Sequence, residues 1–324
     1  MRRVRYYEYG GPDVLRVEDA GIPEPGPGQV RLRAEVIGTN FVDTRFRLGP
    51  AGGALFARPL PGRPTGDVVG VVDTIGPGVD ASLAGRRVGA LVAEDAYAEY
   101  SLAGADDLVP IPDGVDDGTA TTLASTAPVA LGVLRLGRLA AGETVLVHAA
   151  AGGIGHLIVQ LARQRGARVI ATASSASKLE FARSFGADAG VDHTAADWPE
   201  QVRAAAPGGV DLVVDAIGGD VLRQSVDLLA PFGRAVVYGA AGGELTSVPV
   251  TSLFGLRAVL GFSYLAWRAA APAQARDVIA ELTRDARAGR LRAAVHARLP
   301  LADAAAAHRI LDDRVQHGRV LLVP

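Results

Sequence analysis

The chain has 324 residues, a formal net charge of -2 and no cysteine, so disulfides, thiolate nucleophiles and cysteine-ligated zinc or iron–sulfur sites are excluded. Positive and negative charges are mixed along the chain, with no block of one sign. The charge pattern therefore indicates neither a nucleic-acid-binding surface nor an acidic tail. No apolar stretch is long enough for a signal peptide or a membrane span. We therefore expect a cytoplasmic α/β protein with no membrane partner, and the length suggests two domains.

The first hundred residues carry short β-like segments separated by glycine and proline clusters. Residues 30–38 (VRLRAEVIG), 67–76 (DVVGVVDTIG) and 96–102 (AYAEYSL) alternate or run apolar. This pattern predicts a small β-rich, barrel-like unit.

From about residue 118 the pattern changes to strands that alternate with helices. Strands are predicted at 143–149, 167–173, 209–218 and 233–239, and helices between them at 155–166, 177–186 and 221–229. Repeated units of this kind build a parallel sheet with helices on both faces. Two helical stretches and a closing strand, 318–324, follow residue 263. We expect limits of 1–120 for the β-rich part, 121–262 for the parallel-sheet domain and 263–324 for the C-terminal segment.

A glycine turn joins the first strand of this sheet to its helix. In Ala150-Ala151-Gly152-Gly153-Ile154-Gly155 the pattern GxGxxG has alanine at its first position, and a strand precedes it while a helix follows. Gly152 would let the backbone approach a pyrophosphate, Gly155 would let the helix pack on the strand, and the helix N-terminus would offer free N–H groups. The residues Gly152, Gly153, Ile154 and Gly155 are thus predicted to bind a dinucleotide. The alternative is a turn needed only for packing.

The second strand lacks the acid that would bind the ribose 2′-hydroxyl of NAD. It ends instead in Ser174 and Ser175, with Lys178 close behind, and the strand ending near His193 would reach the same edge of the sheet. Hydroxyl donors and a cation suit a 2′-phosphate, whereas a carboxylate would repel it. These residues predict NADPH as the cofactor. Taken singly, Lys178 also fits a solvated helix residue and His193 a loop residue.

The order of these elements resembles the zinc-free quinone oxidoreductase, or zeta-crystallin-like, group of medium-chain dehydrogenases/reductases. The resemblance covers nearly the whole chain. It rests on GTNFVDTRFRLG, PTGDVVGVVDTIGPGV, AYAEYSLAGADDLVPIPDGV, HAAAGGIG, DLVVDAIGG, GRAVVYGAAGG and GRVLLVP. It implies a GroES-like catalytic domain built from the N-terminal part and the C-terminal segment, a Rossmann domain between them, a cleft for NADPH and substrate, and a homodimer or tetramer.

The resemblance also implies that no metal is bound. Zinc members carry cysteine where this chain has Asn40, and a His-Glu pair where it has Gly66 and Asp67. A catalytic zinc needs three protein ligands, so oxidation of a zinc alkoxide is disfavoured. The reaction that remains is hydride transfer to an acceptor that needs no metal, such as a quinone or a conjugated carbonyl.

Further site residues are implied by the resemblance. Asn40 and Asp43 would line the cleft as catalytic residues, although both also suit local turn chemistry. Tyr264 would deliver a proton if it faces the cleft; otherwise water would. The cofactor contacts would come from Thr126, Ile217, Tyr238, Gly239, Ala240, Phe262, Ser263 and Arg319. Spacing leaves Val129 as an alternative to Thr126, and Arg319 also fits a surface charge. His148 is interpreted as a hydrogen-bonded core residue rather than a base.

The leading hypothesis is therefore an NADPH-dependent, metal-free reductase of quinones. An enoyl or alkenal reductase, such as one of secondary metabolism, would use the same site, because both acceptors take hydride in conjugation with a carbonyl. A non-catalytic NADPH-binding protein is the alternative from another class. A methyltransferase fits less well, since its cofactor also usually needs an acid after the second strand.

Overall fold

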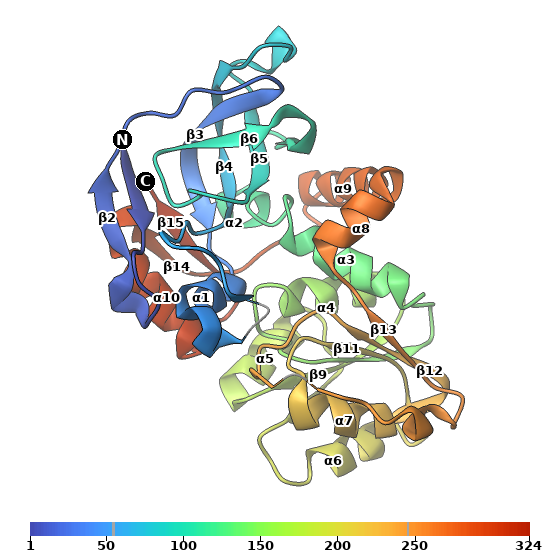
Figure 1. The fold of residues 1–324 in the computed structure, drawn as a ribbon. Coiled ribbons are helices and arrows are strands. Elements are labelled where there is room, and N and C mark those ends of the chain that lie inside the picture. Colours follow the sequence, from blue (N-terminus) through green and yellow to red (C-terminus); the bar gives the residue numbers. More distant parts are fainter. Residues whose placement is uncertain (54–55, 245) are drawn as a thin grey trace. The chain divides into compact units, whose positions relative to one another are not determined.

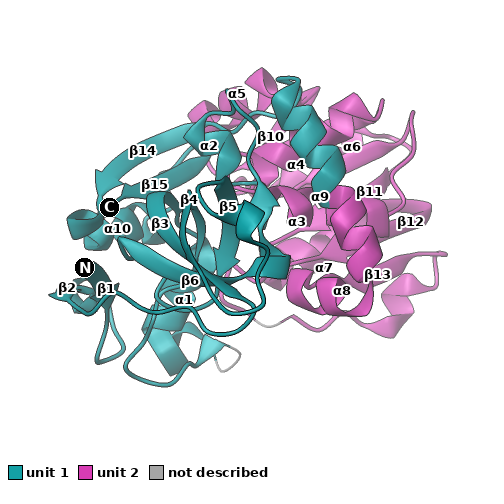
Figure 2. Cartoon of the chain, turned by 90° about the horizontal axis from the view of Figure 1, so that it is seen from above, with its two compact units in different colours: residues 1–126, 279–324 teal, residues 127–278 magenta. Residues whose placement is uncertain are grey.

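The computed structural model describes residues 1–53, 56–244 and 246–324. These residues form two units, coloured separately in Figure 2: residues 1–126 together with 279–324, and residues 127–278. The C-terminal segment therefore returns to the N-terminal part. None of the helices in the described ranges has the length and apolarity needed to cross a bilayer.

Unit 1 is built around a sheet whose strands are antiparallel except at one edge. The strand order is β14-β15-β3-β4-β5-β7, and β6 pairs with β3. The strands span β3 Gln29–Gly38, β4 Gly66–Ile75, β5 Arg87–Val92, β6 Tyr100–Gly104, β7 Val109–Pro110, β14 Val295–Pro300 and β15 Arg319–Val323. A separate hairpin pairs β1 (Arg2–Arg5) with β2 (Arg16–Asp19). Because β15 pairs with β3 directly, the last residues of the chain lie beside residues 37–38.

The helices of unit 1 are α1 (Phe41–Leu48), α2 (Asp117–Ala120) and α10 (Ala304–Asp312). Leucine and alanine side chains of α10 and the turn before it join the apolar core under β3, β4 and β5. The longer α9 (Pro272–Arg287) crosses the limit between the two units, and α3 (Thr126–Leu136) begins at the last residue of the first part of unit 1.

Unit 2 is a parallel sheet in the order β10-β9-β8-β11-β12-β13. Its strands are β8 Thr144–Val147, β9 Arg168–Ala173, β10 Ala189–Asp192, β11 Val210–Asp215, β12 Leu229–Val237 and β13 Ala258–Gly261. The order reverses after β10, as in dinucleotide-binding folds. The helices are α4 Gly155–Gln164, α5 Ala176–Ser184, α6 Trp198–Ala205, α7 Gly219–Asp227 and α8 Tyr264–Ala270. Figure 1 shows α4 and α5 on one side of this sheet and α6 and α7 on the other.

Burial on both faces explains the apolar strands of unit 2. Val145, Leu146 and Val147 of the central strand are all fully buried. A strand covered on both sides has a continuous apolar sequence, whereas burial alternates along β14 and the first part of β3 in unit 1.

The limits of the units differ from those expected at residues 120 and 262. Residues 263–278 remain with unit 2 because the chain packs directly after β13. Phe262 N donates to Val237 O at 2.8 Å, and the Phe262 ring lies 5.7 Å from that of Trp267 in α8. The Phe262 ring also fills the space beside Gly132, where a Cβ atom would come within 2.5 Å of it.

Each unit contains a buried histidine, His148 in unit 2 and His308 in unit 1, whose ring is neutral and hydrogen-bonded. His148, immediately after β8, bonds Thr172 Oγ1 at 2.8 Å and Ser225 Oγ at 2.7 Å. Ser225 donates its own proton to Val221 O, so it accepts from His148 Nε2. The interpretation of His148 as a core residue is thus confirmed. In unit 1, Arg47 donates to His308 Nδ1 at 3.0 Å.

Because these two histidines are buried, we expect the free energy of unfolding to fall in acid. Burial lowers the pKa of each ring to about 3, and Arg47 adds repulsion to protonated His308. The unfolded chain, with a histidine pKa near 6.5, binds more protons below that pH. The stabilising contribution is therefore complete above pH 6.5 and falls as the pH drops, by up to about 1.4 kcal/mol per pH unit for each ring.

The His148→Gln variant isolates this effect, because glutamine keeps a hydrogen-bonding amide but does not titrate. We expect the Tm difference between wild type and variant to shrink steadily from pH 7.5 to pH 4.5. The buried Asp43 and Asp215 have raised pKa values, about 7 and about 6, which act with the opposite sign but cancel in this comparison. A Tm difference that does not change with pH would contradict the prediction.

Candidate active site

The carboxyl ends of the parallel strands bring most predicted cofactor residues to one edge of unit 2. Because β8 to β13 run in the same direction, the segments that follow them share this edge. These segments contain Gly152 to Gly155, Ser174, His193, Ile217, Tyr238 to Ala240 and Phe262 to Tyr264. The sheet thus gathers side chains that are up to 112 positions apart in the sequence.

The glycine turn is as tight as its pattern predicts. A Cβ atom on Gly155 would lie 2.1 Å from Ala149 O and 2.8 Å from Ala150 Cα, while one on Gly152 would lie 3.2 Å from Ala149 O. Within the described chain, the N–H groups of Gly153 and Ile154 donate to no other atom. Two unused donors at the start of α4 form a site suited to an anionic phosphate.

The end of β9 presents the polar residues expected there. Ser175 caps α5, its Oγ accepting from Lys178 N at 3.4 Å, and Lys178 Nζ lies 3.4 Å from Ser174 Oγ. His193 N donates to Ala173 O at 3.2 Å, so the loop after β10 lies beside the end of β9. One acid stands at the end of β10: the Oδ1 atom of Asp192 accepts from Thr194 N and Oγ1.

Asp215 at the end of β11 shapes the loop that carries Ile217, and sequence reasoning missed it. Its carboxylate accepts from Ile217 N at 3.2 Å and from Gly218 N at 2.9 Å. Burial raises the pKa of Asp215 to about 6, and the two N–H bonds oppose that rise. An acid at the end of a buried strand, three residues before a glycine pair, is the signal that could have revealed it.

The last two strands place the remaining residues of unit 2. Tyr238 N donates to Asp215 O at 2.9 Å, which ties the segment of Tyr238 to Ala240 to the neighbouring loop. Ser263 caps α8 through Ala266 N. The Tyr264 ring is 8% exposed and packs against Trp267 and Arg268. These contacts describe a packing role, and proton donation by Tyr264 stays a prediction.

In unit 1, Asn40 is joined to an ion pair. Arg319 Nη1 donates to Asn40 Oδ1 and Nη2 donates to Asp67 Oδ2, both at 2.9 Å. Asn40 Nδ2 lies 3.3 Å from the same Asp67 oxygen, and Ser125 Oγ donates to the other one. Asn40 precedes α1, but its side chain makes no capping bond to the helix. Turn chemistry therefore does not explain this asparagine, and a surface position does not explain Arg319, which is 2% exposed.

Asp43 lies inside unit 1 on α1. Its Oδ1 atom accepts from Thr65 N at 2.8 Å and Thr65 Oγ1 at 2.9 Å, while Oδ2 is buried and has no partner among the described residues. Burial raises the pKa of Asp43 to about 7, against the effect of the Thr65 bonds. The carboxyl is 2% exposed, and its direct contact with a ligand stays a prediction.

Thr126 is the first residue of α3 and is buried. Its Oγ1 atom is 3.4 Å from Thr122 O, the carbonyl one turn back in the chain. Val129, the alternative position, is half-buried. The choice between them stays open.

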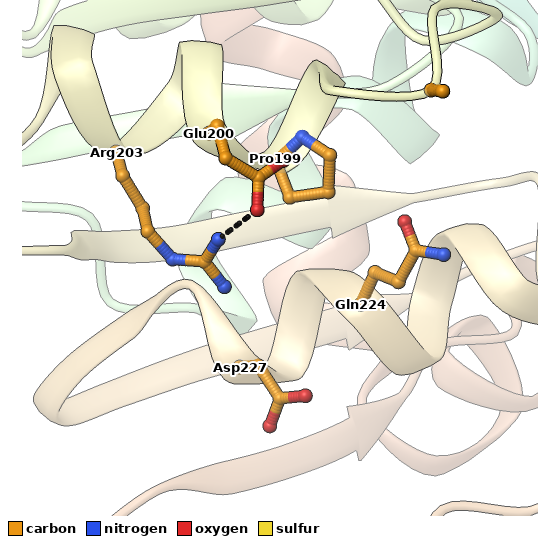
Figure 3. A pocket seen from close by; sticks show the side chains of 6 residues that line it. Pro199, Glu200, Arg203, Gln224 and Asp227 are labelled. Carbon is orange, nitrogen blue, oxygen red and sulfur yellow. Dashed lines mark hydrogen bonds and ion pairs between the residues drawn. The ribbon is translucent and has the colours of Figure 1, made fainter.

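A hollow of about 290 Å³ opens elsewhere in unit 2, between α6 and α7 (Figure 3). It is lined by Ala196, Pro199, Glu200, Arg203, Gln224 and Asp227. Glu200 and Arg203 pair with each other at 2.9 Å. None of these residues belongs to the carboxyl edge described above, so we assign the hollow no role in the site.

Comparison with known proteins agrees with this arrangement. Residues 26–122 match the alcohol dehydrogenase GroES-like domain, and residues 153–283 match the zinc-binding dehydrogenase family. A 2-haloacrylate reductase of Burkholderia sp. is 36% identical over 98% of this chain and 97% of its own. A quinone oxidoreductase of Pseudomonas aeruginosa is 34% identical over 100% of this chain and 99% of its own. The chain belongs to the quinone oxidoreductase group of the medium-chain dehydrogenases/reductases.

Solved structures of this oxidoreductase group share the whole fold. A mycobacterial protein in complex with NADPH gives a TM-score of 0.92 at 34% identity. The Escherichia coli quinone oxidoreductase in complex with NADPH gives 0.91 at 28% identity. Both alignments cover 100% of each chain. The predicted fold, a GroES-like part with a Rossmann sheet, is confirmed.

The zinc-ligand positions named above hold other groups in this member of the dehydrogenase/reductase family. Asn40 and Asp67 are bound to Arg319, and Gly66 is packed so closely that a Cβ atom would lie 3.1 Å from Ile37 and 3.2 Å from Ala96. Over residues 1–53, 56–244 and 246–324, no three His, Cys, Asp or Glu side chains gather in a way that could hold a metal ion.

Proposed function

We propose that the protein binds NADPH and reduces a quinone by hydride transfer without a metal ion. The observation that carries the proposal is the corner at the end of β9, where Ser174, Ser175 and Lys178 stand in place of an acid. Lys178 is the only lysine of the chain, every other one of its 33 basic residues being arginine. A compact ammonium beside two hydroxyls suits the 2′-phosphate of NADPH.

The glycine turn supports the same cofactor. The unused N–H groups of Gly153 and Ile154, at the positive end of α4, would hold the pyrophosphate. Ile217 would pack near the adenosine ribose, and Tyr238 to Ala240 and Phe262 to Ser263 would line the path to the nicotinamide. The NADPH complexes of the two related structures support this assignment.

Bound NADPH would supply the hydride. Reduction of a quinone takes one hydride from the cofactor and one proton from solvent, which yields a hydroquinone and NADP⁺. The half-buried amide of Asn40 offers a donor for the oxygen that gains negative charge. The packed Gly66 and the Arg319 ion pair support a site without zinc.

A second candidate is reduction of an activated carbon–carbon double bond. The printed activity of the Burkholderia relative, a 2-haloacrylate reductase, favours it. The same residues would serve, because hydride adds in conjugation with a carbonyl and a proton then adds to the adjacent carbon.

An initial-rate assay separates these candidates. NADPH oxidation is followed at 340 nm with 9,10-phenanthrenequinone, trans-2-hexenal and 2-chloroacrylate as acceptors. We expect the highest kcat/KM with the quinone. A higher value with an alkene would replace quinone reduction by the second candidate. Tight NADPH binding without turnover of any acceptor would favour a non-catalytic binding protein.

We also propose that the protein is a cytoplasmic homodimer. The edge strand β13 has one paired neighbour, β12, and Phe232, Phe254 and Leu256 expose 78%, 76% and 58% of their surface in the same unit. Apolar side chains beside an open strand edge favour pairing with a second copy. Light scattering should then return about twice the chain mass of 33.4 kDa, and a mass equal to one chain would contradict a dimer.

A further inference from the structure

The buried side chain of Arg319 binds two other side chains, those of Asn40 and Asp67. The exposed fractions of the Arg319 and Asp67 side chains are 2% and 0%, and their ion pair measures 2.9 Å. The structure makes room for the guanidinium at Gly38, where a Cβ atom would lie 1.9 Å from Arg319 Nη2. Gly38 is the register partner of Asp67 across β3 and β4, so these three residues meet at one point of the sheet.

The chemistry of the two partners determines which way the Asn40 amide points. A guanidinium only donates hydrogen bonds, so the atom facing Arg319 must be the amide oxygen. A carboxylate only accepts, so the atom facing Asp67 must be the amide nitrogen. The reversed amide would lose both bonds. The second N–H of Asn40 makes no hydrogen bond within the described chain, and the side chain is half-buried rather than enclosed.

We propose that Arg319 and Asp67 are positioning residues that present this second N–H of Asn40 to the carbonyl oxygen of the electron acceptor. The inference rests on the proposed reductase function, and it gives Arg319 a role different from the cofactor contact expected at first. A donor held in place before the oxygen gains charge needs no reorganisation during the reaction. Ser125 supports the arrangement by holding the far oxygen of Asp67.

The amide orientation is measurable without substrate, because Asn40 is the only asparagine of the chain. Protein labelled with ¹⁵N-asparagine gives one side-chain NH₂ group in an NMR spectrum. We expect a rigid ¹⁵N–¹H heteronuclear NOE in the wild type and a mobile one in Arg319→Lys. The shorter lysine side chain carries a single nitrogen in place of the two Nη atoms that bond Asn40 and Asp67 separately. Gly38→Ala keeps every charge but displaces the guanidinium, so it should have the same effect.

Kinetics then test whether the two positioning residues act through Asn40. With NADPH and 9,10-phenanthrenequinone, Asn40→Ala should lower kcat about 100-fold, as loss of one oxyanion donor does. Arg319→Lys should lower kcat about 10-fold alone and less than about twofold in the Asn40→Ala background, because residues that act as a unit are not additive. The Kd of NADPH should change less than about twofold in every variant.

Arg5→Lys provides the matched control. Arg5 forms a two-bond pair with Asp95 in the same unit, at 2.9 and 2.7 Å, without contact with Asn40. It should leave kcat and the Asn40 NOE at wild-type values, even if its Tm falls as far as that of Arg319→Lys.

Three results would overturn the positioning role. A rigid Asn40 amide in both Arg319→Lys and Gly38→Ala would show that the pair does not hold it. Independent, multiplicative losses of kcat would separate Arg319 from Asn40. A rise in the Kd of NADPH with unchanged kcat would return Arg319 to cofactor binding. Failure of the proposed function would look different, since wild-type protein would then oxidise no NADPH with any acceptor.

Discussion

Replacing Lys178 by alanine is expected to remove the preference for NADPH over NADH. In the proposed complex the ammonium and Ser174 share the 2′-phosphate, and a charge-assisted contact of this kind changes affinity about 10- to 100-fold. The Kd of NADPH should rise by that factor, while the Kd of NADH, which has no 2′-phosphate, should stay the same. Titration of the protein with each cofactor, followed by the fluorescence of the reduced nicotinamide, measures both values.

Arg183→Ala is the matched control for this prediction. Arg183 lies on the same helix and is paired with Glu180, so the variant loses the same charge without touching the predicted phosphate site. An equal loss of NADPH affinity in Arg183→Ala would mean that net charge, not a local contact, sets the preference. Adding Ser174→Asp to Lys178→Ala should reverse the preference, because the new carboxylate repels phosphate and accepts from ribose hydroxyls.

The single lysine allows a second readout of the same site. Reductive methylation with ¹³C-formaldehyde labels the Lys178 amine and the chain N-terminus. NADPH should shift the Lys178 dimethylamine resonance, and NADH should leave it in place. Equal shifts with both cofactors would place Lys178 away from the 2′-phosphate.

Much of the fold could be predicted from sequence because its signals are local. Strand and helix periodicities along residues 143–239 predict a parallel sheet, and a parallel sheet brings the carboxyl ends of its strands together. That geometry is why Ser174, His193 and Ile217 could be assigned to one edge before the structure was known. The same reasoning predicted the tight approach at Gly155, which depends only on a strand, a turn and a helix in succession.

Contacts between distant residues were beyond such reasoning. Asn40 and Arg319 are 279 positions apart, and Asp67 was noted only as a position where zinc members of the family carry a ligand. Only the register of β3 with β4 and β15 brings the three together. The sequence therefore indicated that zinc ligands were missing, but not that a buried ion pair occupies the place. Asp215 was missed for a related reason, since its role is to accept backbone N–H bonds within its own loop.

Gly155→Ala is expected to weaken NADPH binding and to lower the thermal stability of unit 2. The added Cβ atom would lie 2.1 Å from Ala149 O and 2.8 Å from Ala150 Cα, and both are backbone atoms that a rotamer change cannot move. The turn must therefore open. Opening should withdraw the N–H groups of Gly153 and Ile154 from the pyrophosphate, and we expect about 100-fold weaker NADPH binding. Overpacking of this kind costs about 3 kcal/mol, which corresponds to a fall in Tm of about 6–12 °C.

A graded series of glycine variants separates this local effect from a general loss of glycine flexibility. On Gly152 the added Cβ atom would lie 3.2 Å from Ala149 O, and on Gly208 it would meet nothing within 4 Å. None of the three glycines has a positive φ, so alanine strains none of them by backbone angle. Losses in NADPH affinity should decrease from Gly155→Ala to Gly152→Ala and vanish at Gly208→Ala. Unchanged affinity in Gly155→Ala would mean that the tight turn serves packing alone and that the pyrophosphate binds elsewhere.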